Sequence, residues 1–152
     1  MKSKIKKSIV ICSSASFYSK VVEVKEQLKK LGFNVQIPLV AGKMAKDNDF
    51  SVEKYKTWFN NPNDYKKKAF LTKHHFNKII KGDIILVLNY EKNGKPGYIG
   101  GAVLCEMAIA FHTKKPIFIL NSIDDSSNIK EEIYGMLPTI LKGDLNLINK
   151  FL

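Results

Sequence analysis

The sequence predicts a single α/β domain in which a doubly wound parallel sheet of four to five strands carries helices on both faces. Short, continuous apolar runs recur along the chain, which is the pattern of strands that are covered on both sides. Segments in which apolar residues have helical spacing separate these runs. The chain has 152 residues, which fits one domain of ordinary size with its own core.

The N-terminal part of the chain predicts one β-α-β unit. Residues 8–12 form an apolar run and should be the first strand. From Ser19 onwards the apolar residues are spaced as on one face of a helix, which Gly32 ends. Residues 33–37 alternate as a second strand that stops at Pro38. Crossovers of this kind are right-handed in nearly all known cases.

The middle of the chain is less regular. Residues 39–63 contain one fragment of helical character, at 51–59, and the whole stretch is long enough to act as a lid or a pocket wall. Pro62 can open a helix that runs as far as Gly82.

The second half of the chain repeats the strand–helix alternation. The clearest strand is 83–89, and a Gly-rich loop follows it at 90–101. The remaining elements expected are a helix, a strand, a short helix and an edge strand, at residues 102–113, 116–120, 129–136 and 138–141. Together these elements predict a flavodoxin-like or Rossmann-like three-layer sandwich that spans residues 1–152.

The composition excludes several classes of protein. No apolar run reaches the roughly 18 residues of a membrane span. Met1–Lys4 leads straight into a strand, so we expect no signal peptide. Cys12 and Cys105 both lie in apolar segments and form no C-x-x-C pair, so we expect two buried thiols, no disulfide, no metal site and a reducing cytoplasm. We expect no cofactor.

The net charge of +11 favours anionic ligands, but it does not indicate a DNA-reading protein. All 25 basic residues are lysine, whereas arginine is the residue that most often reads guanine. The lysines are also spread along the chain, as expected for solvated faces. Generic nucleic-acid binding is therefore the weakest of the functional alternatives.

Two loops should lie at the ligand-binding edge of such a sheet, beyond the carboxyl ends of the strands. The first, residues 13–16, carries three hydroxyls and joins a strand to a helix. It is either an anion-binding turn or a plain turn with a serine N-cap, and the sequence does not decide between them. The second loop runs from Asn89 to Gly101.

Glu106 is the sharpest chemical signal in the sequence. It is the only charged residue between 98 and 111, in a helix that is otherwise apolar. A carboxylate in such surroundings is costly unless it faces a polar cavity. The alternative is an acid near the start of a helix that complements the helix dipole on an exposed strip.

Three other polar residues have less specific patterns. His74 and His75 lie on the helix before the 83–89 strand, where packing or surface solvation is the usual role of a histidine. Asp83 opens that strand and should lie at the edge opposite the ligands, as a structural residue.

The region from Asp83 to Leu120 resembles the nucleoside 2-deoxyribosyltransferase superfamily. The resemblance is carried by DIILVLN at 83–89, YIGGAVLCEMAIAF at 98–111 and KPIFIL at 115–120. In that family a strand-opening Asp leads to a Gly-rich loop, then to a Glu within E-x-x-x-A, then to K-x-[PV]-[IV] and another strand. The resemblance extends to the first strand and to residues 70–121, and is poor in the middle of the chain.

The resemblance implies an activity and a set of site residues. Glu106 would be the nucleophile that attacks the anomeric carbon of a (deoxy)ribosyl group, releases the base and forms a glycosyl-enzyme. His75 would donate a proton to the leaving base. The substrate would be a nucleoside or nucleotide, and relatives complete their pockets across a homo-oligomer interface, as dimers or larger assemblies. The substrate-binding residues implied are Ser13, Ser14, Ser16, Phe17, Asn89, Tyr98, Gly100 and Gly101.

The chain departs from the family pattern at two positions. The family tyrosine on the first strand is Ile11, and an Asp found in the transferases six residues before the nucleophile is Gly100. These departures leave open a non-catalytic nucleotide-binding module on the same fold. A phosphoribohydrolase-like enzyme is a further alternative, although the threonine of its P-G-G-x-G-T-x-x-E motif is Ala102 here.

Overall fold

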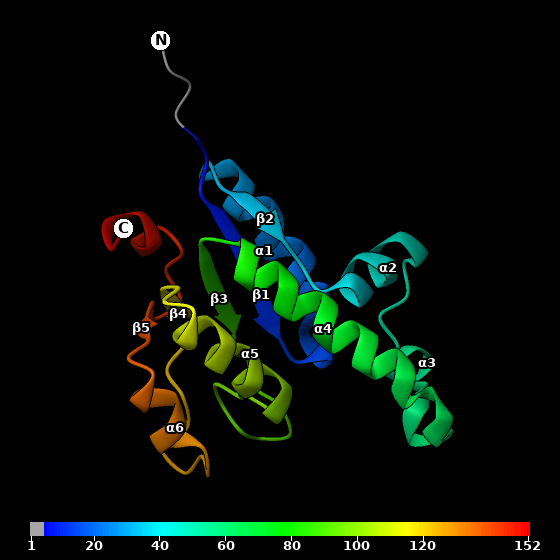
Figure 1. Ribbon diagram of the computed structural model, residues 1–152. Helices are drawn as coiled ribbons and strands as arrows, with labels where there is room; N and C mark the ends of the chain where they lie inside the picture. The colour runs from blue at the N-terminus through cyan, green and yellow to red at the C-terminus, as the bar shows by residue number, and fades with distance from the viewer. Residues whose placement is uncertain (1–4) are drawn as a thin grey trace.

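The computed structural model describes residues 5–152 and shows a five-stranded parallel sheet with helices on both faces (Figure 1). The expectation for Met1–Lys4 lies outside the described residues. The strands are β1 (Ser8–Ser13), β2 (Asn34–Gln36), β3 (Ile84–Leu88), β4 (Ile117–Ile119) and β5 (Thr139–Ile140). The α-helices are α1 (Tyr18–Lys30), α2 (Leu39–Asp47), α3 (Val52–Tyr55), α4 (Tyr65–Lys81), α5 (Gly101–His112), α6 (Lys130–Gly135) and α7 (Leu147–Lys150). Short 3₁₀ turns lie at Ala15–Phe17, Thr57–Phe59 and Pro62–Asp64.

The strand order is β2-β1-β3-β4-β5, and every pairing is parallel. The chain runs outward from β1 to β2 and then crosses to β3 on the other side of β1, so the switch point lies between β1 and β3. The doubly wound α/β fold and the edge position of β5 are as the sequence predicts.

Alternation along the strands divides the core into two layers. Ile9 and Ile11 of β1 pack on the face covered by α1 and α7, whereas Val10 and Cys12 pack on the face covered by α4, α5 and α6. β3 alternates in the same way, and all five of its residues are buried. This double burial explains the continuous apolar runs in the sequence. It also means that Cys12 points into the layer between the sheet and α4 and α5, which lie side by side (Figure 1).

Asp83 has the structural role that its position predicts. Its Oδ2 accepts hydrogen bonds from the Ser8 backbone N–H at 2.8 Å and from the Ser8 hydroxyl at 3.2 Å. These contacts join the amino ends of β1 and β3, at the edge opposite the carboxyl ends of the strands. They hold the pKa of Asp83 below its ordinary value, since the carboxylate form accepts both bonds.

The sequence missed two helices and misjudged one cysteine. Residues 39–63 contain α2 as well as the predicted fragment, and α7 near the C-terminus has no clear helical spacing. Cys105 was expected to be buried but is exposed, because it lies on the side of α5 that faces away from the sheet. Within residues 5–152, no helix combines the length and the apolar character that crossing a membrane would require.

The loop after β3 is fixed by a reciprocal pair of asparagines. The Asn89 side chain accepts from the Asn121 backbone N–H at 2.8 Å and donates to the Asn121 carbonyl at 2.7 Å. The Asn121 amide in turn donates to the Asn89 carbonyl at 3.1 Å. Asn89 is fully buried. Through these bonds the side chain of Asn89, which the resemblance implied as substrate-binding, joins the ends of β3 and β4.

Gly97 lets this loop pass directly against the β4–α6 connection. It has φ +60°, and a Cβ at this position would lie 2.0 Å from the Ser122 carbonyl oxygen. Gly94 in the same loop also has a positive φ, +77°, but no atom lies within 4 Å of its would-be Cβ. A substitution at Gly97 would therefore suffer both steric crowding and backbone strain, whereas one at Gly94 would suffer backbone strain alone.

We expect Gly97→Ala to lower the free energy of unfolding by more than about 2 kcal/mol, because strain and a backbone clash add together. Gly94→Ala carries only the strain and should cost about 1 kcal/mol. Urea denaturation of the two variants measures the difference. Equal losses in both would show that the loop is not packed against Ser122.

Candidate functional site

A cavity of about 330 Å³ opens at the carboxyl edge of the sheet, close to the switch point. The segment after β1 supplies Ala15 and Tyr18, and α5 supplies its first turns. One wall comes from α4, and the opposite wall comes from residues 38–58, the stretch in which a pocket wall was predicted. The remaining lining residues are mainly apolar and aromatic, as is usual for small-molecule sites.

Three side chains from three different elements meet beside this cavity, and two of them, His75 and Glu106, line it. Cys12 is near the end of β1, His75 is on the buried face of α4, and Glu106 is in the second turn of α5. The Cys12 Sγ lies 3.6 Å from the His75 Nε2, and the Glu106 Oε2 lies 4.0 Å from the same nitrogen. The alternation of β1 and the contact between α4 and α5 bring these residues together.

The surroundings of Glu106 favour the protonated form of its carboxyl group. Its side chain is only 16% exposed, and Oε2 has no hydrogen-bond partner among the described residues. Burial raises the pKa of Glu106 from 4.5 to about 7, although the Cys12 thiol and the Lys68 ammonium offset part of this effect. At neutral pH the site therefore contains a mixture of carboxyl and carboxylate, which is typical of functional acids.

His75 lies beside Glu106, on the face of α4 that lines the cavity, as the resemblance requires. Its protonation state differs from what that role implies. Burial and the charge of Lys78 lower the pKa of His75 to about 4, so that the imidazole is neutral at pH 7. A neutral imidazole is a much weaker acid than the protonated imidazole that donating to a leaving base would use. Between these two groups, Glu106 is the one that holds a proton near neutral pH.

Tyr18 is a cavity residue that the sequence did not single out. It begins α1 and lines the same cavity as Glu106. Burial, the Glu106 carboxylate and the Cys12 thiol all raise its pKa above the ordinary value. The hydroxyl therefore stays protonated and can donate a hydrogen bond near the carboxylate. Ile11, at the position of the family tyrosine, is fully buried in the opposite layer of the core.

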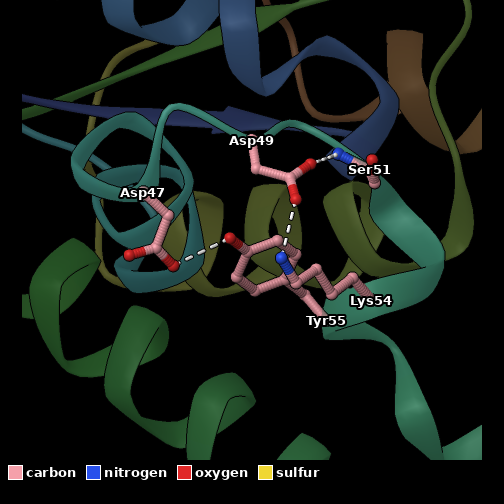
Figure 2. A network of polar contacts seen from close by, with 5 residues as sticks. All are labelled: Asp47, Asp49, Ser51, Lys54 and Tyr55. Carbon is pink, nitrogen blue, oxygen red and sulfur yellow. Dashed lines mark hydrogen bonds and ion pairs between the residues drawn. The ribbon is translucent and has the colours of Figure 1, made fainter.

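The cavity wall between α2 and α3 is fixed by polar contacts (Figure 2). Asp49 accepts from the Ser51 backbone N–H at 3.0 Å and from the Lys54 ammonium at 2.8 Å. Tyr55 donates its hydroxyl to Asp47 at 2.9 Å. Because Tyr55 lines the cavity, these bonds hold its ring in the wall.

Lysines give this side of the cavity a positive charge. Lys56 and Lys68 line it, and burial together with the charges of Lys68 and Lys92 lowers the pKa of Lys56. Lys92 also donates to the Ser14 hydroxyl at 3.3 Å. Three cations that repel one another at the rim of a pocket favour an anionic ligand group.

The serines of the first loop act mainly as a turn. Ser14 caps the short helix Ala15–Phe17 by accepting from the Ser16 backbone N–H at 3.4 Å, and the Ser13 hydroxyl donates to the Ser14 carbonyl at 3.1 Å. Phe17 packs edge-on against Tyr90, with ring centroids 5.4 Å apart. Ser13, Ser14, Ser16 and Phe17 do not line the cavity that contains Glu106. Of this region, only Ala15 and Tyr18 do.

The glycines of the second loop divide between two cavities. Gly101 lines the cavity of Glu106 and also a neighbouring one of about 280 Å³. Tyr98 and Gly100 line only the second. The structure thus brings together Glu106, His75 and Gly101 among the predicted site residues, and it adds Cys12 and Tyr18.

Comparison with protein-family models finds none that matches the chain, and comparison with curated proteins finds no match either.

Proposed function

We propose that the cavity binds a nucleoside or nucleotide and that the carboxylate of Glu106 cleaves its N-glycosidic bond. The observation that carries this proposal is the buried Glu106 carboxyl, with an unpartnered oxygen, at the base of a largely apolar cavity. A carboxylate at that position can attack the anomeric carbon, while the C–N bond breaks and its electron pair leaves with the base, which takes a proton from water. Water or a second base then resolves the glycosyl-enzyme. The resemblance of the region from Asp83 to Leu120 to the 2-deoxyribosyltransferase superfamily supports the same chemistry.

The lining suits the two ends of such a substrate. Tyr55, Trp58 and Phe76 provide aromatic surface for a base. Lys56 and Lys68 provide positive charge for a phosphate. Tyr18, whose raised pKa keeps its hydroxyl protonated, lines the same cavity and is the residue we propose as a hydrogen-bond donor to the substrate.

A direct assay tests this proposal. The protein is incubated with each deoxynucleoside and each deoxynucleoside 5′-monophosphate, with a chelator present, and free base is measured by chromatography. We expect base release, and faster release from the monophosphates because of the lysines. Binding of these ligands without any base release would instead support the non-catalytic nucleotide-binding module, which Ile11 and Gly100 keep as the second candidate.

We expect the rate of base release to rise with pH through about 7, because only ionised Glu106 can attack. Cys12, Tyr18, His75 and Lys68 surround this carboxyl, and with its low pKa His75 should not contribute a limb near neutrality. A pH–rate profile of the wild type and of His75→Gln measures this. Loss of the limb in His75→Gln would assign the titration to the histidine.

We also propose that the protein is a homo-oligomer, a dimer or larger. Ala102, Cys105, Ala108 and Phe111 are exposed and form an apolar strip that winds around the half of α5 facing away from the sheet, and Phe111 is 49% exposed. Ala102 and Cys105 also line the cavity, so a second copy on this strip would help to close it. Light scattering at micromolar concentration should show at least a dimer; a monomer would contradict this.

We further propose a cytoplasmic location, because free thiols such as Cys12 and Cys105 are typical of proteins in a reducing compartment.

A further inference from the structure

The meeting of Cys12, His75 and Glu106 has a chemical property that base release does not use. The three side chains offer one ligand atom each, a sulfur, an imidazole nitrogen and a carboxylate oxygen, and these atoms all lie within 4.8 Å of one another. This mixture of donors is the set that Zn²⁺ selects in proteins. His75 and Cys12 are buried, and Glu106 is nearly so.

The spacing of the three atoms is close to that of ligands around one ion. In a tetrahedral zinc site, ligand atoms lie about 3.4 to 3.6 Å from one another, since each is roughly 2.0 to 2.3 Å from the metal. The Sγ–Nε2 distance here is 3.6 Å and the Nε2–Oε2 distance is 4.0 Å. The third pair, the Cys12 Sγ and the carboxylate oxygen, lies within 4.8 Å, so a shift of about 1 Å in the Glu106 side chain would complete the arrangement.

A second observation points independently to a ligand at this place. The Glu106 Oε2 is buried, and no hydrogen bond reaches it from any residue of the described chain. An unsatisfied buried carboxylate oxygen is costly, and a cation removes that cost. The Cys12 Sγ likewise faces the histidine nitrogen within the core and not a backbone donor.

We propose that Cys12 Sγ, His75 Nε2 and Glu106 Oε2 form a site for Zn²⁺ or a divalent ion of similar chemistry. Three protein ligands leave a fourth coordination position, as in zinc sites that bind water or a substrate. His75 and Glu106 both line the cavity of about 330 Å³, so we expect that position to face the cavity. Metal binding requires the thiolate of Cys12, the neutral imidazole of His75 and the carboxylate of Glu106, and it releases the protons that these groups carry.

This site and the proposed nucleophile share the Glu106 carboxylate. A cation bound to Oε2 withdraws negative charge from the whole carboxylate, so metal loading should slow base release. That consequence rests on the proposed function, whereas metal binding itself does not.

The test is a titration of chelator-treated, reduced protein with Co²⁺, followed by displacement with Zn²⁺ and without any nucleotide present. We expect one Co²⁺ per chain and the absorption band of a thiolate–cobalt bond, which Zn²⁺ abolishes. Cys12→Ser, His75→Gln and Glu106→Gln should each weaken binding by at least about tenfold, because even second-shell changes at metal sites have effects of that size. Circular dichroism checks that each variant is folded.

Matched controls come from the neighbouring residues. Cys105→Ser removes the exposed thiol and His74→Gln the adjacent imidazole, and both should leave the cobalt band unchanged. A wild type without a stoichiometric thiolate–cobalt band overturns the inference. So does a band that Cys105→Ser removes and Cys12→Ser retains. Because base release is assayed with chelator and metal binding without nucleotide, failure of either proposal is recognised separately.

Discussion

Glu106→Gln should abolish base release while the protein keeps its fold. The substitution preserves the size of the side chain and removes the negative charge that attacks the anomeric carbon. Loss of a covalent nucleophile lowers the rate by at least about a thousandfold in comparable enzymes. Chromatography of the released base, with chelator present, measures the effect.

His74→Gln is the matched control for this experiment. His74 is adjacent to His75 on α4 but packs against Phe70, with ring centroids 5.7 Å apart, and it does not line the cavity. Its substitution should leave the rate close to that of the wild type. Near-normal turnover in Glu106→Gln would show that another group performs the chemistry.

The same substitution should make the protein more stable in alkaline solution. The pKa of Glu106 is about 7 in the folded protein and 4.5 for an ordinary glutamate. A pKa that folding raises means that the unfolded chain ionises first, so wild-type stability falls between about pH 4.5 and 7 and stays low above that range. The pKa difference corresponds to about 3 kcal/mol, and Gln has no such penalty.

Urea denaturation of both proteins at pH 5 and pH 8, in the presence of chelator, measures this difference. We expect the advantage of Glu106→Gln over the wild type to grow by about 2 to 3 kcal/mol between the two pH values. An advantage that is the same at both would mean that Glu106 titrates normally and faces water. The expected gain would show that keeping an ionisable carboxyl at this buried position lowers the free energy of unfolding of the wild type.

The fold could be predicted because its signals are local. β3 and β1 are apolar along their whole length, since helices cover both faces of the sheet, and α1 has clear helical spacing. α2 was missed because the stretch that contains it carries little regular periodicity, and its contacts with α1 and α4 hold it in place. Short elements such as α7 depend on packing in the same way.

The site was predicted only in part, because the spacing of residues along the chain does not reveal which distant residues lie close together in the fold. Glu106 was found as an isolated charge in an apolar helix. Cys12 was interpreted as an inert core residue, and its neighbour His75 is 63 positions away along the chain. The strand register and the face of α4 decide that they meet. The contacts between Asn89 and Asn121 could not be predicted, because a polar residue at the end of a strand can face either a ligand or another loop.

Mass spectrometry of the intact protein tests most directly whether Glu106 forms a covalent bond to the sugar. The protein is incubated with the deoxynucleoside monophosphate that releases base fastest, quenched with acid and weighed, and its peptides are then mapped. We expect a deoxyribosyl 5-phosphate adduct on the peptide that contains Glu106, and no adduct in Glu106→Gln. An adduct on any other residue would contradict a covalent role for Glu106. So would base release that forms no adduct and continues in Glu106→Gln.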